Sequence, residues 1–462
     1  MTGVPTRPRP WAAGGFYGWH IVVWSCIALA MTGPGQTAGV SVFIDPLIAD
    51  LGLNRSTIST AYLLGTVGGA VAMPFVGRAI DRFGVRWTMT VIAIVYGTVL
   101  CSLAGVSSLV GLTAGFVGLR MASQGALQLA ATTAVALWFS RRRGTAVGIV
   151  SGIGMMGISL TPVIVEGLIE ATTWRVAWLA EGLAVWAVVL PIAVFAMRDR
   201  PEALGQHVDG QAPDADGPRR EHWGVGRAQA MRTGFFWVAC IAVAVSGLLV
   251  TAVNFHQISL LGEQGLDTAQ AAGNFLPQTV ASLAATFGVG ALADRVASRW
   301  LIVASMLGLA AALLCGVIVR PGWSAVVFGL LLGAALGSIR SVEAATFPRH
   351  FGVAHVGEIR GTVAAVSVGS TAFGPLLFAS IHDLEASYVP ALLVTAPIPV
   401  LVAVAALVVR PPTFPDRVAG ETENPVDTGT GEDAGPGPAE VDMEAGTERR
   451  TEDQPTASVP RN

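Results

Sequence analysis

Long apolar segments recur along the whole chain, and they constrain its fold more than any other feature of the sequence. Breaking the chain at its prolines, glycines and charges leaves about twelve such segments, among them residues 235–260, 300–319 and 387–409. A run of about 20 apolar residues can cross a hydrocarbon layer about 30 Å thick as a helix, which satisfies its own backbone inside lipid. The sequence therefore predicts an all-α polytopic membrane protein with twelve transmembrane helices.

Composition agrees with this prediction and excludes most soluble classes of protein. Hydrophobic residues make up 52% and charged residues 13% of the 462 residues, whereas a soluble chain carries about 25% charge. All 28 basic residues are arginine, which excludes a nucleotide-binding loop that needs lysine. The four cysteines lie singly in apolar runs, which predicts buried thiols rather than ligands. We expect no metal, no cofactor, no nucleic-acid partner and no enzymatic activity.

Polar segments and arginine placement predict the organisation and orientation of the chain. A cytoplasmic N-terminus, a first six-helix half, a cytoplasmic linker, a second six-helix half and an acidic disordered tail are expected at 1–18, 19–196, 197–234, 235–410 and 411–462. Most arginines outside the tail fall on one side of the spans, and only Arg55, Arg175 and Arg320 fall on the other. The positive-inside rule then places both termini in the cytoplasm of a multi-pass cell-membrane protein.

A repeated loop indicates how the spans are grouped. The loop from Gly77 to Trp87, after the second span, shares its glycine, Asp-Arg, arginine and tryptophan spacing with the loop from Gly290 to Trp300, after the eighth. Such a repeat predicts two pseudo-symmetric six-helix halves related by parallel duplication. The aspartates can accept charge-assisted hydrogen bonds from arginines or helix N-termini, and would latch one side shut. The predicted gating residues are Gly77, Asp81, Arg82, Arg86, Gly290, Asp294, Arg295 and Arg299.

These loops resemble the hallmark of the major facilitator superfamily, G-x-x-x-D-R-x-G-R-[RK], although the second copy has Ala297 where the family prefers glycine. Further motifs are similar to the monocarboxylate-transporter branch and its oxalate/formate-exchanger relatives. They are Gly14–Trp19 before the first span, Trp138–Gly148 before the fifth, Arg198–Gly205 after the sixth and Phe255-His256 in the seventh. The resemblance implies a transporter with alternating access and a substrate path between the halves, near the bilayer midplane.

Charged side chains inside the spans are candidates for the site, because a central arginine costs about 2.5–3.5 kcal/mol and needs a function or a partner. Arg340 and Glu343 lie one turn apart in the tenth span and could pair, or Arg340 could bind a substrate carboxylate while Glu343 takes up a proton. Arg120 shares a predicted helical face with Gln124 and Gln128, which suggests an anion or proton-relay site.

Uncharged polar groups extend this set. His256 is a second candidate for proton coupling, because its ordinary pKa lies near neutrality, although a lone histidine is more often structural. The remaining substrate-binding candidates are Gln36, Asn254, Asn274, Gln278, Ser282 and Thr286. In the resembled branch, an arginine and an aspartate usually occupy the positions of Thr286 and Ser282, so a simple lactate-type proton symporter is not expected. The break at Gly33-Pro34-Gly35, beside Gln36, predicts a hinge that lines the path.

The predicted function is secondary active transport of a small solute through proton symport or anion exchange. The resemblance implies that the solute is an organic carboxylate. An alternative is a proton-coupled drug or metabolite efflux antiporter. Its G-x-x-x-G-P motif is matched only in part, with Thr161 in place of the second glycine. A transport-inactive membrane sensor is a remote alternative, disfavoured by the two intact gating loops. The expected partners are the lipid bilayer, an organic anion and protons or a counter-anion.

Overall fold

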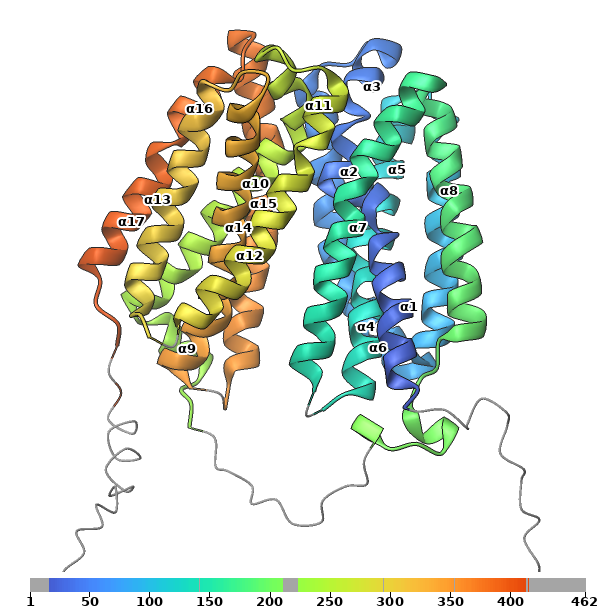
Figure 1. Ribbon diagram of the computed structural model, residues 1–462, viewed down its shortest axis with the longest axis vertical. Coiled ribbons are helices and arrows are strands. Elements are labelled where there is room, and N and C mark those ends of the chain that lie inside the picture. Colours follow the sequence, from blue (N-terminus) through green and yellow to red (C-terminus); the bar gives the residue numbers. More distant parts are fainter. Residues whose placement is uncertain are drawn as a thin grey trace, which may run out of the picture. The chain divides into compact units, whose positions relative to one another are not determined.

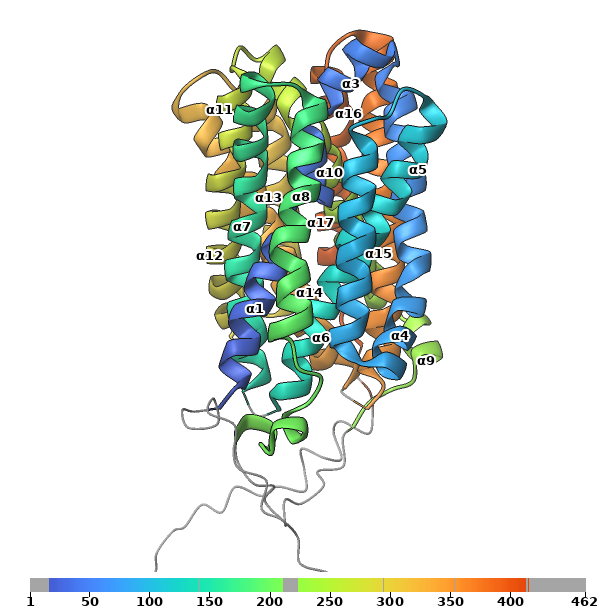
Figure 2. The ribbon, with the colours of Figure 1, turned by 90° about the vertical axis from the view of Figure 1, so that its right-hand side faces the viewer.

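Helices account for nearly all regular structure in this chain. The computed structural model describes residues 16–140, 142–210, 223–293, 295–352, 354–412 and 414, and the helices lie in one compact unit. In these ranges no β-strand occurs, apart from an isolated bridge between Gly224 and Gly352. Figures 1 and 2 show the long helices running side by side along one common direction.

The first half contains the helices that precede the linker. They are α1 (Gly18–Ala30), the 3₁₀ turn η2 (Gly33–Gly35), α2 (Thr37–Ser41), α3 (Ile44–Leu51), α4 (Arg55–Leu103), α5 (Leu109–Arg120), the π-helical η3 (Met121–Leu127), α6 (Gln128–Trp138), α7 (Arg143–Ala171), α8 (Trp174–Pro191) and the π-helical η4 (Ile192–Ala196). The 3₁₀ turns η5 (Pro201–Leu204) and η6 (Val208–Gly210) and the short α9 (Arg227–Met231) follow.

The second half contains the remaining helices. They are α10 (Gly234–Glu263), α11 (Thr268–Gly273), α12 (Phe275–Ala293), α13 (Ser298–Val317), α14 (Trp323–Phe351), α15 (Val356–Glu385), α16 (Val389–Thr395) and α17 (Pro397–Val408). Several helices begin at a side chain that accepts a backbone N–H, which satisfies a donor that the first turn cannot. Thr233 caps α10 in this way, Asp267 caps α11, and Asn54 caps α4.

Twelve spans follow from these helices. Nine helices of the described ranges are long and apolar enough to cross a membrane. The other three spans are interrupted: the first by the break at Gly33–Gly35, the second by its fusion with the third inside α4, and the fourth by η3. Within α4, Gly84 has φ 82° and ψ 165°, and this non-helical residue separates the two spans. The prediction of an all-α, twelve-helix membrane protein in two six-helix halves is confirmed.

The two halves meet at one end of the bundle. We call the end that carries α3 and α11 the distal end, and the end that carries α9 and the start of α1 the linker end (Figures 1 and 2). At the distal end, Ser259 Oγ of α10 lies 2.7 Å from Asp45 Oδ2 and 2.8 Å from Arg55 Nη1, which also pairs with Asp45. Ser56 of α4 donates to the carboxylate of Asp383 in α15.

Deeper in the bundle, Ser159 of α7 forms a hydrogen bond with Thr279 of α12. Among the described residues, every hydrogen bond between the halves lies at this level or nearer the distal end. The halves diverge toward the linker end in Figure 1. The protein is therefore closed at its distal end.

Close packing of α12 on α14 depends on a row of glycines. Gly329, Gly333 and Gly337 recur every four residues, so they share one face of α14. A Cβ added at Gly333 would clash with the carbonyl oxygen of Gln278, and one at Gly337 with that of Ser282. Small residues at such spacing let helix backbones approach closely in membranes.

We expect Gly333→Ala to lower the stability of the folded protein by about 1–3 kcal/mol or more, because α12 and α14 must separate to admit the methyl group. The measurement is the thermal unfolding of detergent-purified protein. Gly308→Ala in α13 is the matched control, since a Cβ there meets no atom within 4 Å. Equal unfolding temperatures for the two variants would contradict the packing argument.

Candidate substrate site

A cavity of about 520 Å³ lies between the two halves. Helices of both halves line it, including η3, α6 and α7 from the first half and α10, α12, α14 and α15 from the second. Most of its lining side chains carry hydroxyl or amide groups. Among the described residues, Arg340 and Glu343 are its only charged lining residues. Apolar side chains, such as Phe275 and Leu336, line much of the rest, and both charges come from one face of α14.

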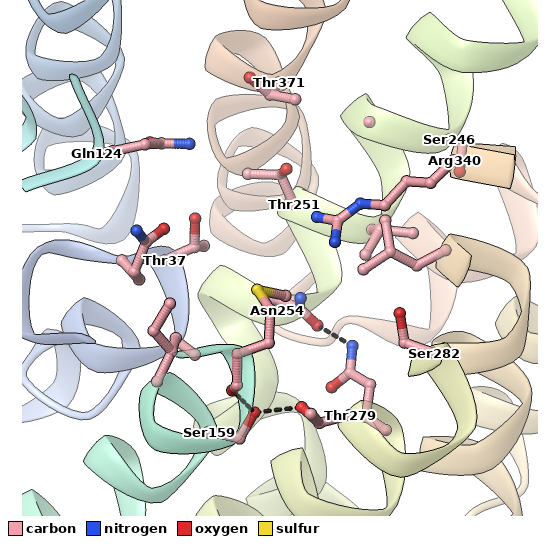
Figure 3. Close-up of a pocket in the computed structure, with 18 of the residues that line it drawn as sticks. Thr37, Gln124, Ser159, Ser246, Thr251, Asn254, Thr279, Ser282, Arg340 and Thr371 are labelled. Carbon is pink, nitrogen blue, oxygen red and sulfur yellow. Dashed lines mark hydrogen bonds between the residues drawn. The ribbon is translucent and has the colours of Figure 1, made fainter. Parts of the chain in front are cut away.

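Arg340 projects from α14 into the cavity (Figure 3). Its side chain is exposed to the cavity, and within the described part of the chain its guanidinium has no hydrogen bond and no ion pair. Glu343, one turn further on, is half-buried and forms no ion pair with Arg340 in the described ranges. Arg340 and Arg360 of α15 both attract its charge. A guanidinium without a partner at membrane depth can bind an anion.

Hydrogen bonds between α12 and α14 fix the position of Arg340. Ser341, the next residue of α14, donates to Thr286 O at 2.6 Å, and Thr286 Oγ1 lies 3.3 Å from Gly337 O. A smaller hollow of about 240 Å³ is lined by Ser282, Thr286 and Arg340 together with residues of α7. The structure therefore brings these two hydroxyl residues beside the arginine of the tenth span.

A pair of amides joins α10 to α12 at the cavity wall. Gln278 Nε2 donates to Asn254 Oδ1 at 2.7 Å, and both residues line the cavity (Figure 3). Gln278 Oε1 has no hydrogen-bond partner among the described residues. Asn274, one turn before Gln278, does not line the cavity, and its Nδ2 donates to Ala325 O of α14 at 2.6 Å. It therefore joins the junction of α11 and α12 to α14.

The first half contributes a wall of amides opposite. Gln36, which follows the broken η2 turn, lies with its Nε2 3.1 Å from Thr32 Oγ1 and 3.4 Å from Gln128 Oε1. Gln124 of η3 also lines the cavity, and it has no hydrogen bond among the described residues. The sequence predicted that Gln124 and Gln128 share a helical face with Arg120, but these glutamines were not among the predicted substrate-binding residues.

Arg120 is separated from these glutamines. It is 2% exposed, does not line the cavity, donates from Nη1 to Gly35 O at 3.0 Å and lies over the ring of Tyr62. The shared face was expected for an α-helix, but Met121–Leu127 is π-helical, so the spacing of side chains around the axis differs. In this conformation Arg120 stabilises the break in the first span, and substrate binding by Arg120 stays a prediction.

His256 also lies outside the cavity lining. It is fully buried, and its ring nitrogens pair with Pro375 O at 2.9 Å and with the hydroxyl of Tyr388 at 2.9 Å. These bonds join α10 to α15 and to the start of α16. Nearby, His382 pairs with Glu263 at 2.8 Å, close to the distal end. A role of His256 in proton coupling stays a prediction.

The first gating loop packs on the segment after the sixth span. Asp199 accepts a hydrogen bond of 2.9 Å from the backbone N–H of Arg86, whose Nε donates to Val194 O at 3.0 Å. The Asp199 carboxylate fills the space where a side chain at Gly84 would lie. Sequence reasoning missed Asp199, although it lies within the Arg198–Gly205 motif.

The latch itself is not formed in the described residues. Asp81 is exposed and has no hydrogen bond there, Gly77 lies within α4, and Arg82 lies over the ring of Phe83. In the second loop Asp294 lies outside the described residues. Of its companions, Gly290 faces α14, where an added Cβ would lie 3.9 Å from Ser341 Oγ. Arg295 is exposed, and Arg299 lies over the ring of its neighbour Trp300. The latch stays a prediction for another conformation.

Two six-helix halves around a central cavity with polar and charged groups, closed at one end, define a membrane transporter of small solutes. The family model described as Major Facilitator Superfamily matches residues 23–283 and 274–435. The chain belongs to this superfamily, as the repeated loops suggested, and it is a secondary transporter.

Relatives of known name carry different solutes. A probable nitrate/nitrite transporter of Mycobacterium tuberculosis, NarK2, is 29% identical over 342 residues, which span 71% of this chain and 79% of the relative. Monocarboxylate transporter 6 of Mus musculus is 28% identical over 201 residues, 42% of this chain and 40% of that protein.

Solved structures agree on the fold. A bacterial homolog of the human lysosomal transporter Spinster, inward-facing and occupied, aligns with a TM-score of 0.62 at 15% identity, over 86% of this chain and 97% of that chain. A mutant of the nucleoside transporter NupG aligns with a TM-score of 0.67 at 12% identity, over 85% and 99%.

Proposed function

We propose that the chain carries a small organic carboxylate across the cell membrane, by proton symport or anion exchange through alternating access. The observation that supports this most is the guanidinium of Arg340, which lies in the central cavity without a hydrogen bond or ion pair to any described residue. Arginine presents two parallel N–H donors that match a carboxylate, and such charge-assisted pairs are about twice as strong as neutral hydrogen bonds. The names of two relatives, a nitrate/nitrite and a monocarboxylate transporter, also denote small monovalent anions.

Orientation is part of the proposal. The arginine-rich loops belong to the linker end, which we assign to the cytoplasm. The described conformation is then inward-facing, closed outside by the Asp45–Arg55–Ser259 contacts. Asp81 and Asp294 would accept their latch bonds when the protein faces outward.

Uptake into proteoliposomes tests the proposed function. We expect saturable uptake from a panel of radiolabelled mono- and dicarboxylates, with nitrate included because of the relative's name. An inward proton gradient that raises uptake indicates symport, whereas dependence on internal anion indicates exchange. No uptake of any panel member by folded protein would contradict the anion class, and amphipathic cations would then be tested in the efflux direction.

A further inference from the structure

The wall that faces Arg340 is built from amides and hydroxyls. Figure 3 shows Gln124 and Thr37 extending from the first half toward the side of the cavity where Arg340 projects from the second. Gln124 is exposed to the cavity and has no hydrogen bond among the described residues. Gln36 and Gln128 flank it, joined by a bond of 3.4 Å. A hydrocarbon chain extending from Arg340 could contact the apolar part of the lining but could satisfy none of these amides and hydroxyls, whereas hydroxyl groups on the solute could.

Polar groups without partners also occur on the wall of the second half. Ser246 Oγ of α10 is buried and has no partner among the described residues, and the same holds for Gln278 Oε1 of α12. Both residues line the cavity. Leaving a buried polar group unpaired costs about 1–3 kcal/mol. Both oxygens are covered by neighbouring atoms in this conformation, so a ligand would reach them only after the cavity walls move.

The size of the cavity adds a second, independent constraint. Its volume of about 520 Å³ lies within the range of about 300–1,000 Å³ that is typical of small-molecule sites. Such a cavity can hold a solute of several carbons, and its amides and hydroxyls can donate hydrogen bonds to such a solute and accept them from it.

We propose that the substrate is a polyhydroxylated carboxylate of sugar-acid type, with its carboxylate on Arg340 and its hydroxyls on the amides of Gln36, Gln124 and Gln128. This inference rests on the proposed function and narrows its substrate class. Arg340 binds the charged end of the ligand, and the amides of the first half form hydrogen bonds with its hydroxyls. Closure of the halves around such a ligand would let both ends be bound at once.

Gluconate and hexanoate test this proposal, because both carry one carboxylate on a six-carbon chain and only gluconate has hydroxyls. The measurement is the dissociation constant of each for the purified full chain, by calorimetry, with inhibition of carboxylate uptake as a second readout. We expect gluconate to bind at least about tenfold more tightly, because a site built to hydrogen-bond a hydroxyl rejects the analogue that lacks it. Hexanoate binding equally or more tightly would overturn the proposal.

Substitution of the amide wall locates the preference. Gln124→Leu should weaken gluconate binding about tenfold, because one lost hydrogen bond costs about 1.4 kcal/mol. It should leave hexanoate binding unchanged. Gln229→Leu, at an exposed glutamine of α9 outside the cavity lining, is the matched control. Gln128→Leu serves as the second variant if Gln124→Leu fails to fold. An unchanged gluconate preference in folded amide-wall variants would overturn the assignment.

The outcome also separates this inference from the proposed function. Binding and uptake of small carboxylates without binding of gluconate overturn the inference alone. Failure of every carboxylate, gluconate included, overturns both.

Discussion

Arg340→Gln is expected to lower the affinity for the transported anion by at least about thirtyfold. Removing one partner of a desolvated charge pair typically costs about 2–5 kcal/mol, and 1.4 kcal/mol is a factor of ten. Glutamine keeps much of the length and the hydrogen-bonding capacity of the side chain but loses the charge. The measurement is KM for carboxylate uptake in proteoliposomes, together with the dissociation constant of the purified protein.

Arg340→Lys refines this result. Lysine keeps the charge but lacks the planar fork of donors that matches a carboxylate. We therefore expect affinity between that of the wild type and that of Arg340→Gln. Arg320→Gln is the control, because Arg320 is exposed at the distal end of the bundle and lies outside the cavity lining. A wild-type KM for Arg340→Gln would show that the anion binds elsewhere.

The stability of Arg340→Gln separates substrate binding from a structural role. In the described residues the guanidinium has no hydrogen bond and no ion pair, so the substitution breaks neither, and Glu343 keeps the attraction of Arg360. The unfolding temperature should therefore stay near that of the wild type while transport falls. Arg120 provides the contrast, because its loss would leave Gly35 O without the hydrogen bond it now accepts.

Much of the fold could be predicted from sequence because each membrane helix is recognisable from its own stretch of apolar residues. The apolar runs predict spans one at a time, and the repeat of the Gly77 loop at Gly290 groups them into halves. Arg340 and Glu343 could be singled out for the same reason, because a charge within an apolar run is visible without a structure. These signals depend on residues that are close in the sequence.

Features that depend on departures from ideal helices could not be predicted. The expected face of Arg120, Gln124 and Gln128 assumed a regular α-helix, and the π-helical η3 places the two glutamines at the cavity and the arginine away from it. The distal contacts of Ser259 with Asp45 and Arg55 join segments about two hundred residues apart, so no local pattern marks them.

Under proton symport, one of the two proposed modes, Glu343→Gln is expected to abolish accumulation driven by a proton gradient while exchange of substrate continues. Glu343 shares the cavity with Arg340, and it is attracted by Arg340 and by Arg360. When an anion occupies Arg340, that arginine stabilises the glutamate charge less, and a proton neutralises the carboxylate. Substrate and proton are then bound together. The loaded cavity with a protonated Glu343 carries one unpaired charge fewer across the membrane than the loaded cavity with an ionised Glu343. Glutamine cannot take up this proton.

Accumulation and counterflow give separate measures of these two activities. With one proton carried per monovalent anion, a gradient of one pH unit supports at most about tenfold accumulation, because one unit is worth 1.36 kcal/mol. We expect the wild type to approach this ratio and Glu343→Gln to reach a ratio of about one, with counterflow near that of the wild type. Glu358→Gln, at an exposed glutamate in the first turn of α15, is the control.

Each result bears on a different step. Proton-driven accumulation by Glu343→Gln would remove this carboxylate from the coupling step and leave His256 as the candidate, despite its two occupied ring nitrogens. Loss of counterflow together with accumulation would mean that Glu343 is needed to bind the anion or to change conformation, rather than to carry the proton. Retained counterflow without accumulation assigns the proton to Glu343. Together with a loss of affinity in Arg340→Gln, it divides the two tasks between residues one helical turn apart.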